Sequence, residues 1–320
     1  MHRHVRTVAA RLAVPGAVAA ALAIALAAVA APPAALGQGG PDMVAVTTSN
    51  TMIRFSGANP SAVSAGMPIT GLQSGESVVG IDVRPANGAL YAVGSTGRMY
   101  TINMSTGGAT QSGPTALSLT GTVYGVDFNP VPDRLRVVSD QEQNLRVNVE
   151  TAETTVDGAL AYAATDANAG ANPNVVAAGY TNSMAGATAT TLYVIDSNLD
   201  ILATQNPPND GVLNTVGPLG ANASEIVGFD IAADGNRAFA AVTAQGATTS
   251  DLHSIDLTTG AATRVGTIGG GEAVRGLAYM PSTGAAPAVQ PAPAAKPAAQ
   301  PAQVAKPVGA PAPAPVQIPR

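Results

Sequence analysis

The chain has 320 residues, of which 46% are hydrophobic and 11% charged, with no Cys or Trp, three His and a formal net charge of −5. The lack of Cys excludes a lipid-anchored cysteine. An acidic chain also lacks the basic field by which proteins bind nucleic acid or anionic membranes. We therefore expect no nucleic-acid partner.

Residues 1–37 have the pattern of a secretory signal peptide. Arg3, Arg6 and Arg11 precede an apolar run, Val14–Ala31, and small residues follow it. The alternative is an uncleaved membrane anchor, because the run is near the length that spans a bilayer. Its alanine richness and small-residue exit favour cleavage, which leaves 12 basic against 20 acidic residues and a net charge of −8. We expect a secreted or extracytoplasmic protein (periplasm, cell wall or extracellular space) with no transmembrane segment after cleavage.

A strand-like phrase, Gly-apolar-Asp-apolar, repeats along the next 240 or so residues. It occurs at 80–83, 125–128 and 228–231, and degenerate copies occur at 178–180 and 276–279. The glycines of successive copies are 45, 54, 49 and 48 residues apart. A period of roughly 40–50 residues built from short strands is typical of β-propeller blades.

Alternating apolar residues, with Gly, Asn, Asp, Ser and Pro between them, predict four short strands in each copy. In the first copy, for example, they are 78–84, 89–93, 98–104 and 109–112. The fifth copy has only the strand Val274–Met280, and three strands at the start of the domain, from Met43 onward, complete it. We therefore predict an all-β, five-bladed β-propeller over residues 43–281. Val274–Met280 should pair with Met43–Thr47 to close the ring.

Residues 282–320 consist mostly of Ala and Pro. Such a composition cannot build a core and predicts a disordered, polyproline-like tail. A spacer or tether in the cell envelope and an inert solvated tail are both consistent with it.

Asp82, Asp127 and Asp230 share one position of the repeat. Paired carboxylates are the general acid and base of glycoside hydrolysis, so one hypothesis is a polysaccharide hydrolase. It requires two or three carboxylates that converge in one cleft with at least one raised pKa. The alternative, which we favour, is that a recurring Asp binds backbone amides of an adjoining turn.

Blade 2 is the most charged part of the repeat. Arg134 and Arg136 lie on one face of a predicted strand and Arg146 lies on the next. Three guanidiniums together could bind a carboxylate or phosphate, which makes these residues the candidate ligand-binding site. The alternative is internal pairing with Asp133, Asp140 or Glu142.

Other features carry less chemistry. His253 has no Cys or His partner for zinc and no Gly-x-Ser-x-Gly elbow for a triad, so we predict an ordinary strand residue. Asp196 and Asp200 resemble a calcium loop that lacks its Gly and Glu. We predict no catalytic residue, cofactor or metal. The long loops 162–173 and 205–211 are candidates for recognition.

Several phrases resemble one bacterial secreted-protein family, called domain of unknown function 4394. They are Gly-Ile-Asp-Val-Arg-Pro at 80–85, Gly-Val-Asp-Phe-Asn-Pro at 125–130, Asp133–Ser139, Gln143–Arg146, the stretch 157–173, Thr191–Asp196 and Gln205–Pro208. The resemblance covers about residues 43–281 and implies an exported, propeller-like domain with no established activity. From the residues themselves we expect a non-enzymatic binding or scaffold module whose partner is an envelope polymer or a protein. A carboxylate-based hydrolase and an Arg-lined anion binder are the alternatives.

Overall fold

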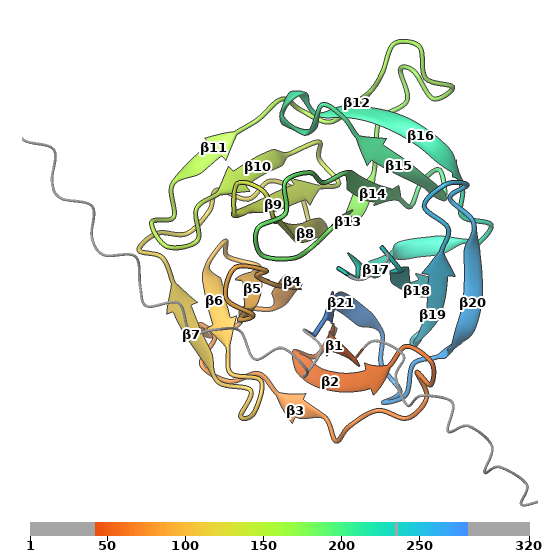
Figure 1. Cartoon of the computed structure of the whole chain (residues 1–320). Coiled ribbons are helices and arrows are strands. Elements are labelled where there is room, and N and C mark those ends of the chain that lie inside the picture. The colour runs from red at the N-terminus through yellow and green to blue at the C-terminus, as the bar shows by residue number, and fades with distance from the viewer. Residues whose placement is uncertain (1–41, 234–235, 281–320) are drawn as a thin grey trace, which may run out of the picture. The chain divides into compact units, whose positions relative to one another are not determined.

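The computed structural model describes residues 42–233 and 236–280, and they form five small β-sheets arranged around a central axis (Figure 1). This confirms the predicted five-bladed β-propeller. The predicted signal peptide and Pro/Ala tail lie outside the described residues. None of the described residues forms a helix long and apolar enough to cross a membrane.

Each blade has an inner strand at the axis, followed outward by the later strands of its repeat. Blade 1 contains β4 (Val78–Val83), β5 (Leu90–Gly94), β6 (Met99–Ile102) and β7 (Ala109–Ser112). Blade 2 contains β8 (Tyr124–Asn129), β9 (Arg134–Ser139), β10 (Asn144–Val147) and β11 (Thr154–Val156). Blade 3 contains β13 (Val175–Tyr180), β14 (Leu192–Asp196), β15 (Ile201–Gln205) and β16 (Val212–Pro218), with β12 (Ala161–Tyr162) at its edge and a short 3₁₀ helix, η1 (Pro208–Asp210). Blade 4 contains β17 (Ala223–Ile231), β18 (Ala238–Ala244), β19 (Ser250–Ile255) and β20 (Ala262–Thr267).

Blade 5 joins the two ends of the described chain. Its inner strand, β21 (Val274–Tyr279), pairs antiparallel with β1 (Asp42–Thr47), with Met43 opposite Tyr279 and Ala45 opposite Leu277. Strands β2 (Thr51–Ser56) and β3 (Met67–Pro68) complete the sheet. The predicted closure is confirmed. It satisfies the inner edge of β1, which would otherwise be an open strand edge.

Blade 3 differs from the sequence prediction in two ways. Strand β12 was not predicted, and it runs parallel to β16. The third copy of the repeat is also shifted by two residues: Ala177 stands where the other blades have the repeat Gly, and Gly179 stands where they have Asp. The sequence alignment places Gly179 at the Gly position of the repeat, whereas in the structure Gly179 occupies the Asp position.

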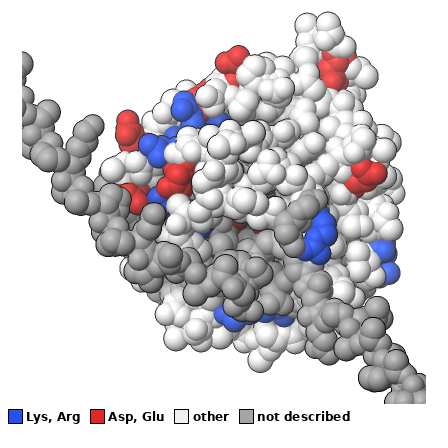
Figure 2. All heavy atoms as spheres, in the orientation of Figure 1, with Lys and Arg blue, Asp and Glu red and all other residues white. Residues whose placement is uncertain are grey.

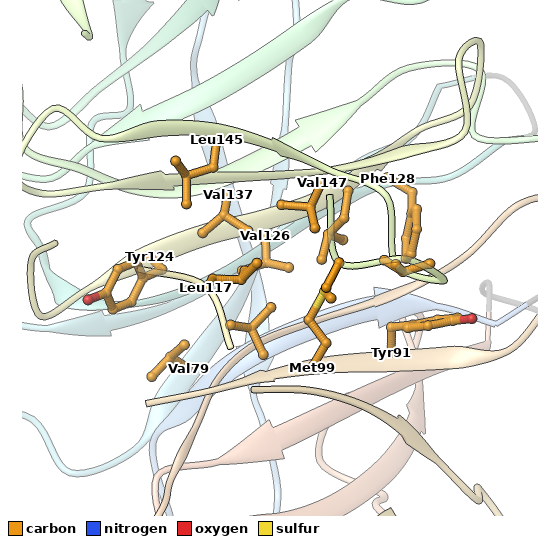
Figure 3. Close-up of a cluster of buried hydrophobic side chains, with 14 residues drawn as sticks. Val79, Tyr91, Met99, Leu117, Tyr124, Val126, Phe128, Val137, Leu145 and Val147 are labelled. Carbon is orange, nitrogen blue, oxygen red and sulfur yellow. The ribbon is translucent and has the colours of Figure 1, made fainter. Parts of the chain in front are cut away.

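The core is a ring of apolar contacts between neighbouring blades rather than one central core. All six residues of β4, and all six of β13, are buried. Between blades 1 and 2, for example, Tyr91 and Met99 face Val126, Phe128 and other apolar side chains (Figure 3). The Tyr91 and Phe128 rings meet edge to face, with centroids 5.2 Å apart. Because both faces of each sheet are covered, its inner strands read as nearly continuous apolar runs.

The repeat glycines have a packing role. A Cβ built on Gly125 would lie 2.7 Å from the backbone of Ala177 and Ala178 in blade 3, and one on Gly228 would lie 2.8 Å from the backbone of Leu277 in blade 5. Real Cβ atoms do not approach backbone so closely. Glycine therefore lets adjacent inner strands come together at the narrow axis.

Gly125→Ala is expected to lower the free energy of unfolding by about 1–3 kcal/mol, because backbone rather than a movable side chain blocks the new methyl group. Chemical denaturation monitored by circular dichroism measures this. The matched control is Gly108→Ala, since a Cβ there meets only the Thr106 hydroxyl, at 3.3 Å. Equal loss in the two variants would contradict close approach as the reason for the repeat glycine.

Candidate functional site

Three carboxylates meet at the axis. Asp82, Asp127 and Asp230 come from the inner strands of blades 1, 2 and 4, and each offers an oxygen within 4.8 Å of the others. Their side chains are buried, with residue exposures of 2%, 1% and 3%. The repeat position therefore brings the three residues together, as the hydrolase hypothesis requires, but it seals them from solvent.

These carboxylates accept hydrogen bonds from one backbone amide of every blade. The amides belong to the residue that follows the Asp position: Val83, Phe128, Tyr180, Ile231 and Tyr279. Asp82 accepts from Val83 (2.6 Å) in its own blade and from Phe128 (2.7 Å) in the next. Asp230 does the same with Ile231 (2.6 Å) and Tyr279 (2.7 Å).

Asp127 completes the set by accepting from Tyr180 of blade 3 at 3.1 Å. Blades 3 and 5 carry Gly179 and Ala278 at the Asp position, so they have no carboxylate to offer. The aspartates of blades 4 and 1 compensate, since each also binds the amide in its own strand. We call the three aspartates and the five amides the axial ring. The aspartates do accept backbone amides, as the alternative that we favour from the sequence predicts, but the prediction that these amides belong to turns is wrong, because they belong to inner strands.

The pKa values of all three aspartates are raised. Burial is the largest cause for each, because charge is costly away from water, and the neighbouring carboxylates add repulsion on Asp82 and Asp127. Burial raises the pKa of Asp230 to about 6, even though two amides oppose the shift. The Asp127 and Asp230 carboxyl groups lie close together, and a hydrogen bond between them would require a proton on one of the two. The ring therefore holds protons to a higher pH than exposed carboxyl groups do.

Raised pKa values and converging carboxylates suit acid–base chemistry or a cation, and this trio is the one potential three-ligand cluster among residues 42–233 and 236–280. Five of its six carboxylate oxygens already accept a backbone amide. The remaining oxygen is the second one of Asp127, whose carboxyl group lies beside that of Asp230. Three of these amide contacts join neighbouring blades and two lie within a strand, so the carboxylates serve as hydrogen-bond acceptors of the framework.

The axial ring should make folding stability fall as pH rises. The folded state holds protons that the unfolded chain releases near pH 4, so the free energy of unfolding should decrease from about pH 4 through pH 6 and above. Asp127→Asn should reduce this dependence, since a carboxamide can accept from Tyr180 and donate to Asp230 without a shared proton.

Urea midpoints at pH 5 and pH 8 measure the effect. His253, whose pKa burial lowers, produces the opposite trend, and it cancels in the comparison of wild type with Asp127→Asn. The control is Asp256→Asn, at a turn on the outer part of blade 4, where the pKa of the carboxyl is lowered by the Thr258 amide. If the free energy of unfolding changes by the same amount between pH 5 and pH 8 in wild type and in Asp127→Asn, the aspartates of the axial ring do not hold extra protons.

The three predicted ligand-binding arginines lie in blade 2 but do not share one site. Arg136 and Arg146 both bind Asp157, with closest N–O distances of 2.6 and 2.9 Å. Arg134 instead donates to the backbone carbonyls of Pro132 and Asp133. An internal anion thus occupies two of the guanidiniums, and it is Asp157 rather than any of the three acids considered from the sequence. Binding of an external anion by these residues stays a prediction.

Arg136 is the centre of a buried polar network between blades 2 and 3. It is 1% exposed and donates to the Tyr180 hydroxyl, Asn144, Asp157 and Asn209. Asn209 belongs to the long loop 205–211, which therefore packs against blade 2. Of the two loops that the sequence suggests for recognition, loop 205–211 is thus held against blade 2 by a buried hydrogen bond.

The other sequence candidates have local partners. In loop 162–173, Asp166 accepts from the backbone and hydroxyl of Thr215, which fixes the loop to β16. His253 is partly buried in mid-strand, its Nδ1 3.2 Å from the Asp251 carbonyl. Asp196 is fully buried and accepts from the Tyr162 hydroxyl at 2.7 Å. These contacts are those of framework residues.

Two arginines were missed by sequence reasoning. Arg84, after β4, crosses from blade 1 to blade 2, where it binds Asp133 at 2.5 Å and Glu150 at 3.1 Å. Figure 2 shows basic and acidic side chains intermingled over the part of the molecule that holds blade 2. In the sequence, the charged turn of blade 2 is the one feature that points to this pair. A single copy of the repeat does not show which residues of two neighbouring blades meet.

The second is Arg275, which borders an opening on the axis. The opening is lined by the Gly position of all five blades and by the apolar residue that follows it: Gly80, Gly125, Ala177, Gly228, Gly276, Ile81, Val126, Ala178, Phe229 and Leu277, with Tyr124, Val227 and Arg275. Arg275 is the single charged residue of this lining.

A protein-family model described as "Domain of unknown function (DUF4394)" matches residues 51–278. No curated protein matches the chain. Among solved structures, a structural-genomics protein of unknown function from Bacteroides thetaiotaomicron is 17% identical, with a TM-score of 0.45, over 71% of this chain and 60% of that one. A chain of the nidogen/laminin complex is 11% identical (TM-score 0.48, 76% of this chain and 99% of that one), and a protein from Lactobacillus plantarum is 17% identical (TM-score 0.40, 74% and 70%). The aligned part thus spans less than two thirds of the Bacteroides chain, and likeness at this level concerns the fold alone.

Proposed function

Because the chain belongs to the DUF4394 family of domains of unknown function, we propose a function from its own geometry: it is an exported, non-enzymatic binding or scaffold module. Its surroundings are the cell envelope or the extracellular space, and its partner is an envelope polymer or a protein.

The axial ring carries the non-enzymatic part of this proposal. The only three-carboxylate cluster of the described residues is buried and accepts an amide from each of five blades. A general acid or base must reach its substrate within hydrogen-bonding distance. Carboxylates at 1–3% exposure that hold the frame together are poorly placed for that task. A rigid ring of blades with loops on two faces suits recognition instead.

The sequence ends support export and a scaffold role. The arginines and apolar run of residues 1–37 support passage through a secretion pathway. The Pro/Ala composition of residues 282–320 supports a spacer between the propeller and an envelope component. A net charge of −8 without the first segment argues against nucleic acid as the partner.

A carboxylate-based polysaccharide hydrolase is the second candidate, favoured by the convergence and raised pKa of the aspartates. Purified protein should bind isolated envelope polysaccharide saturably in a sedimentation assay and release no new reducing ends. Binding should be equal in wild type and Asp127→Asn. Turnover that Asp127→Asn abolishes would establish the hydrolase. Recovery of the chain solely from the cytoplasm of the cells that make it, with residues 1–37 still attached, would contradict export.

A further inference from the structure

The five inner strands all run in the same direction along the axis, so the propeller has two different faces. The Gly position of every blade lines the axial opening, and the amides that follow the Asp position meet further along the same strands, in the axial ring. We call the face where the inner strands begin the entry face and the opposite face the exit face. The entry face consists of loops 69–77, 113–123, 163–174, 219–222 and 268–273, turns 48–50, 95–98, 140–143, 197–200 and 245–249, and the first residues of β17.

Both ends of the described propeller lie on the exit face. Strand β21 ends there, and β1 begins beside it, because Met43 pairs with Tyr279. Residues 281–320 therefore continue from the exit face. If they tether the propeller to the envelope, as in the proposed function, the entry face is the one left open to a partner.

The entry face carries amide side chains that the framework does not use. The following exposed residues make no side-chain hydrogen bond within the described residues: Gln73, Gln141, Asn172, Asn198 and Asn222. On the exit face, Asn206 is the one such residue, and the other asparagines bind the frame: Asn59, Asn87, Asn103, Asn129, Asn148, Asn182, Asn209 and Asn236. Each free amide offers donors and an acceptor to solvent. The entry face therefore has free hydrogen-bonding capacity spread over several blades.

The entry face is also almost without exposed charge. Of its residues, all of them described, Glu225 is the one charged residue that is fully exposed. Buried acids behind the face bind hydroxyls of the frame, as Glu76 does with Tyr100 and Asp140 with Thr122. The exit-face loops, in contrast, expose Glu150, Glu153, Asp210, Arg237 and Asp256. A charged polymer would thus find few complementary charges on the entry face.

We propose that the entry face binds a neutral, hydroxyl-rich polysaccharide. The inference rests on the proposed binding function and names its ligand. A sugar hydroxyl both donates and accepts hydrogen bonds, which matches the free amides of this face. Because the amides come from several blades, one polymer chain can make several weak contacts at once, and their contributions add.

A protein partner fits the entry face less well. The cores of protein interfaces are enriched in aromatic residues, Met and Arg. The exposed large hydrophobic residues of the described chain lie on the exit face or on the outer strands of the blades: Val131, Val156, Met184 and Val265. The entry face has no such anchor among its residues, so its hydrogen-bonding groups are the feature that a partner must match.

Neutral oligosaccharides test the proposal. They are released from isolated envelope polysaccharide by partial acid hydrolysis and freed of acidic fragments on an anion exchanger. Titrated into the ¹⁵N-labelled full chain, they should shift the side-chain amide signals of the free entry-face residues saturably and leave that of Asn206 unchanged. The double variant Gln141→Ala/Asn198→Ala should weaken binding about tenfold. The matched control, Asn206→Ala, removes a free amide from the exit face and should bind as wild type does.

The wild-type amide signals decide the question even if a variant fails to fold. Absence of saturable shifts, shifts confined to Asn206, or equal binding by the double variant would overturn this inference. Saturation solely by the acidic fragments or by an envelope protein would overturn the assignment of the ligand. These outcomes leave the proposed binding function in place. Release of new reducing ends would contradict that function and leave the assignment of the entry face intact.

Discussion

Asp82→Ala is expected to lower the free energy of unfolding by about 2–5 kcal/mol, because it leaves two buried backbone amides without an acceptor. One belongs to Val83 in the same strand and the other to Phe128 in the next blade. The carboxyl group lies in a residue that is 2% exposed, so bulk solvent does not reach these amides. The loss therefore weakens blade 1 and its contact with blade 2 together.

Urea denaturation at pH 6 measures this loss, with two comparisons built into the ring. Asp230→Ala should cost a similar amount, since it also orphans two amides, those of Ile231 and Tyr279. Asp127→Ala should cost less, because it orphans one backbone amide, that of Tyr180, instead of two. Equal losses in all three variants would contradict the amide-counting account of the axial ring.

Arg136→Met is expected to lower the free energy of unfolding by about 3–5 kcal/mol, because removal of one partner of a buried ion pair leaves the other uncompensated. Asp157 would keep only Arg146, which is the more exposed partner. Asn144 and Asn209 would each lose a donor as well. The interface between blades 2 and 3 should open first, since these groups come from both.

Hydrogen exchange can locate that opening: amides of η1 and of the 205–211 loop should lose protection in Arg136→Met before those of blade 5. Arg134→Ala is the control, since Arg134 donates only to carbonyls of its own turn, and its effect should stay within about 0.5 kcal/mol. If Arg136→Met unfolds like wild type while an anion no longer binds, Arg136 serves a ligand and not the frame.

The axial ring also shows why the repeat could be found but not fully interpreted. The Asp position was visible because three copies carry it, and its framework role followed from its recurrence. The missing aspartates of blades 3 and 5 were unremarkable in the sequence. In the structure they explain why Asp82 and Asp230 each bind a second amide in their own strands.

The sequence by itself determined the architecture: a period set by short strands, turn residues between them, and a fifth blade shared by the two ends of the domain. Local patterning suffices for this because each blade repeats the same apolar strands and contacts only its neighbours. The tertiary structure alone decided which charges meet. Arg136 pairs with Asp157, and Arg84 pairs with Asp133 across a blade boundary. Such pairings depend on strand register and on the position of the next blade, and one-dimensional spacing encodes neither.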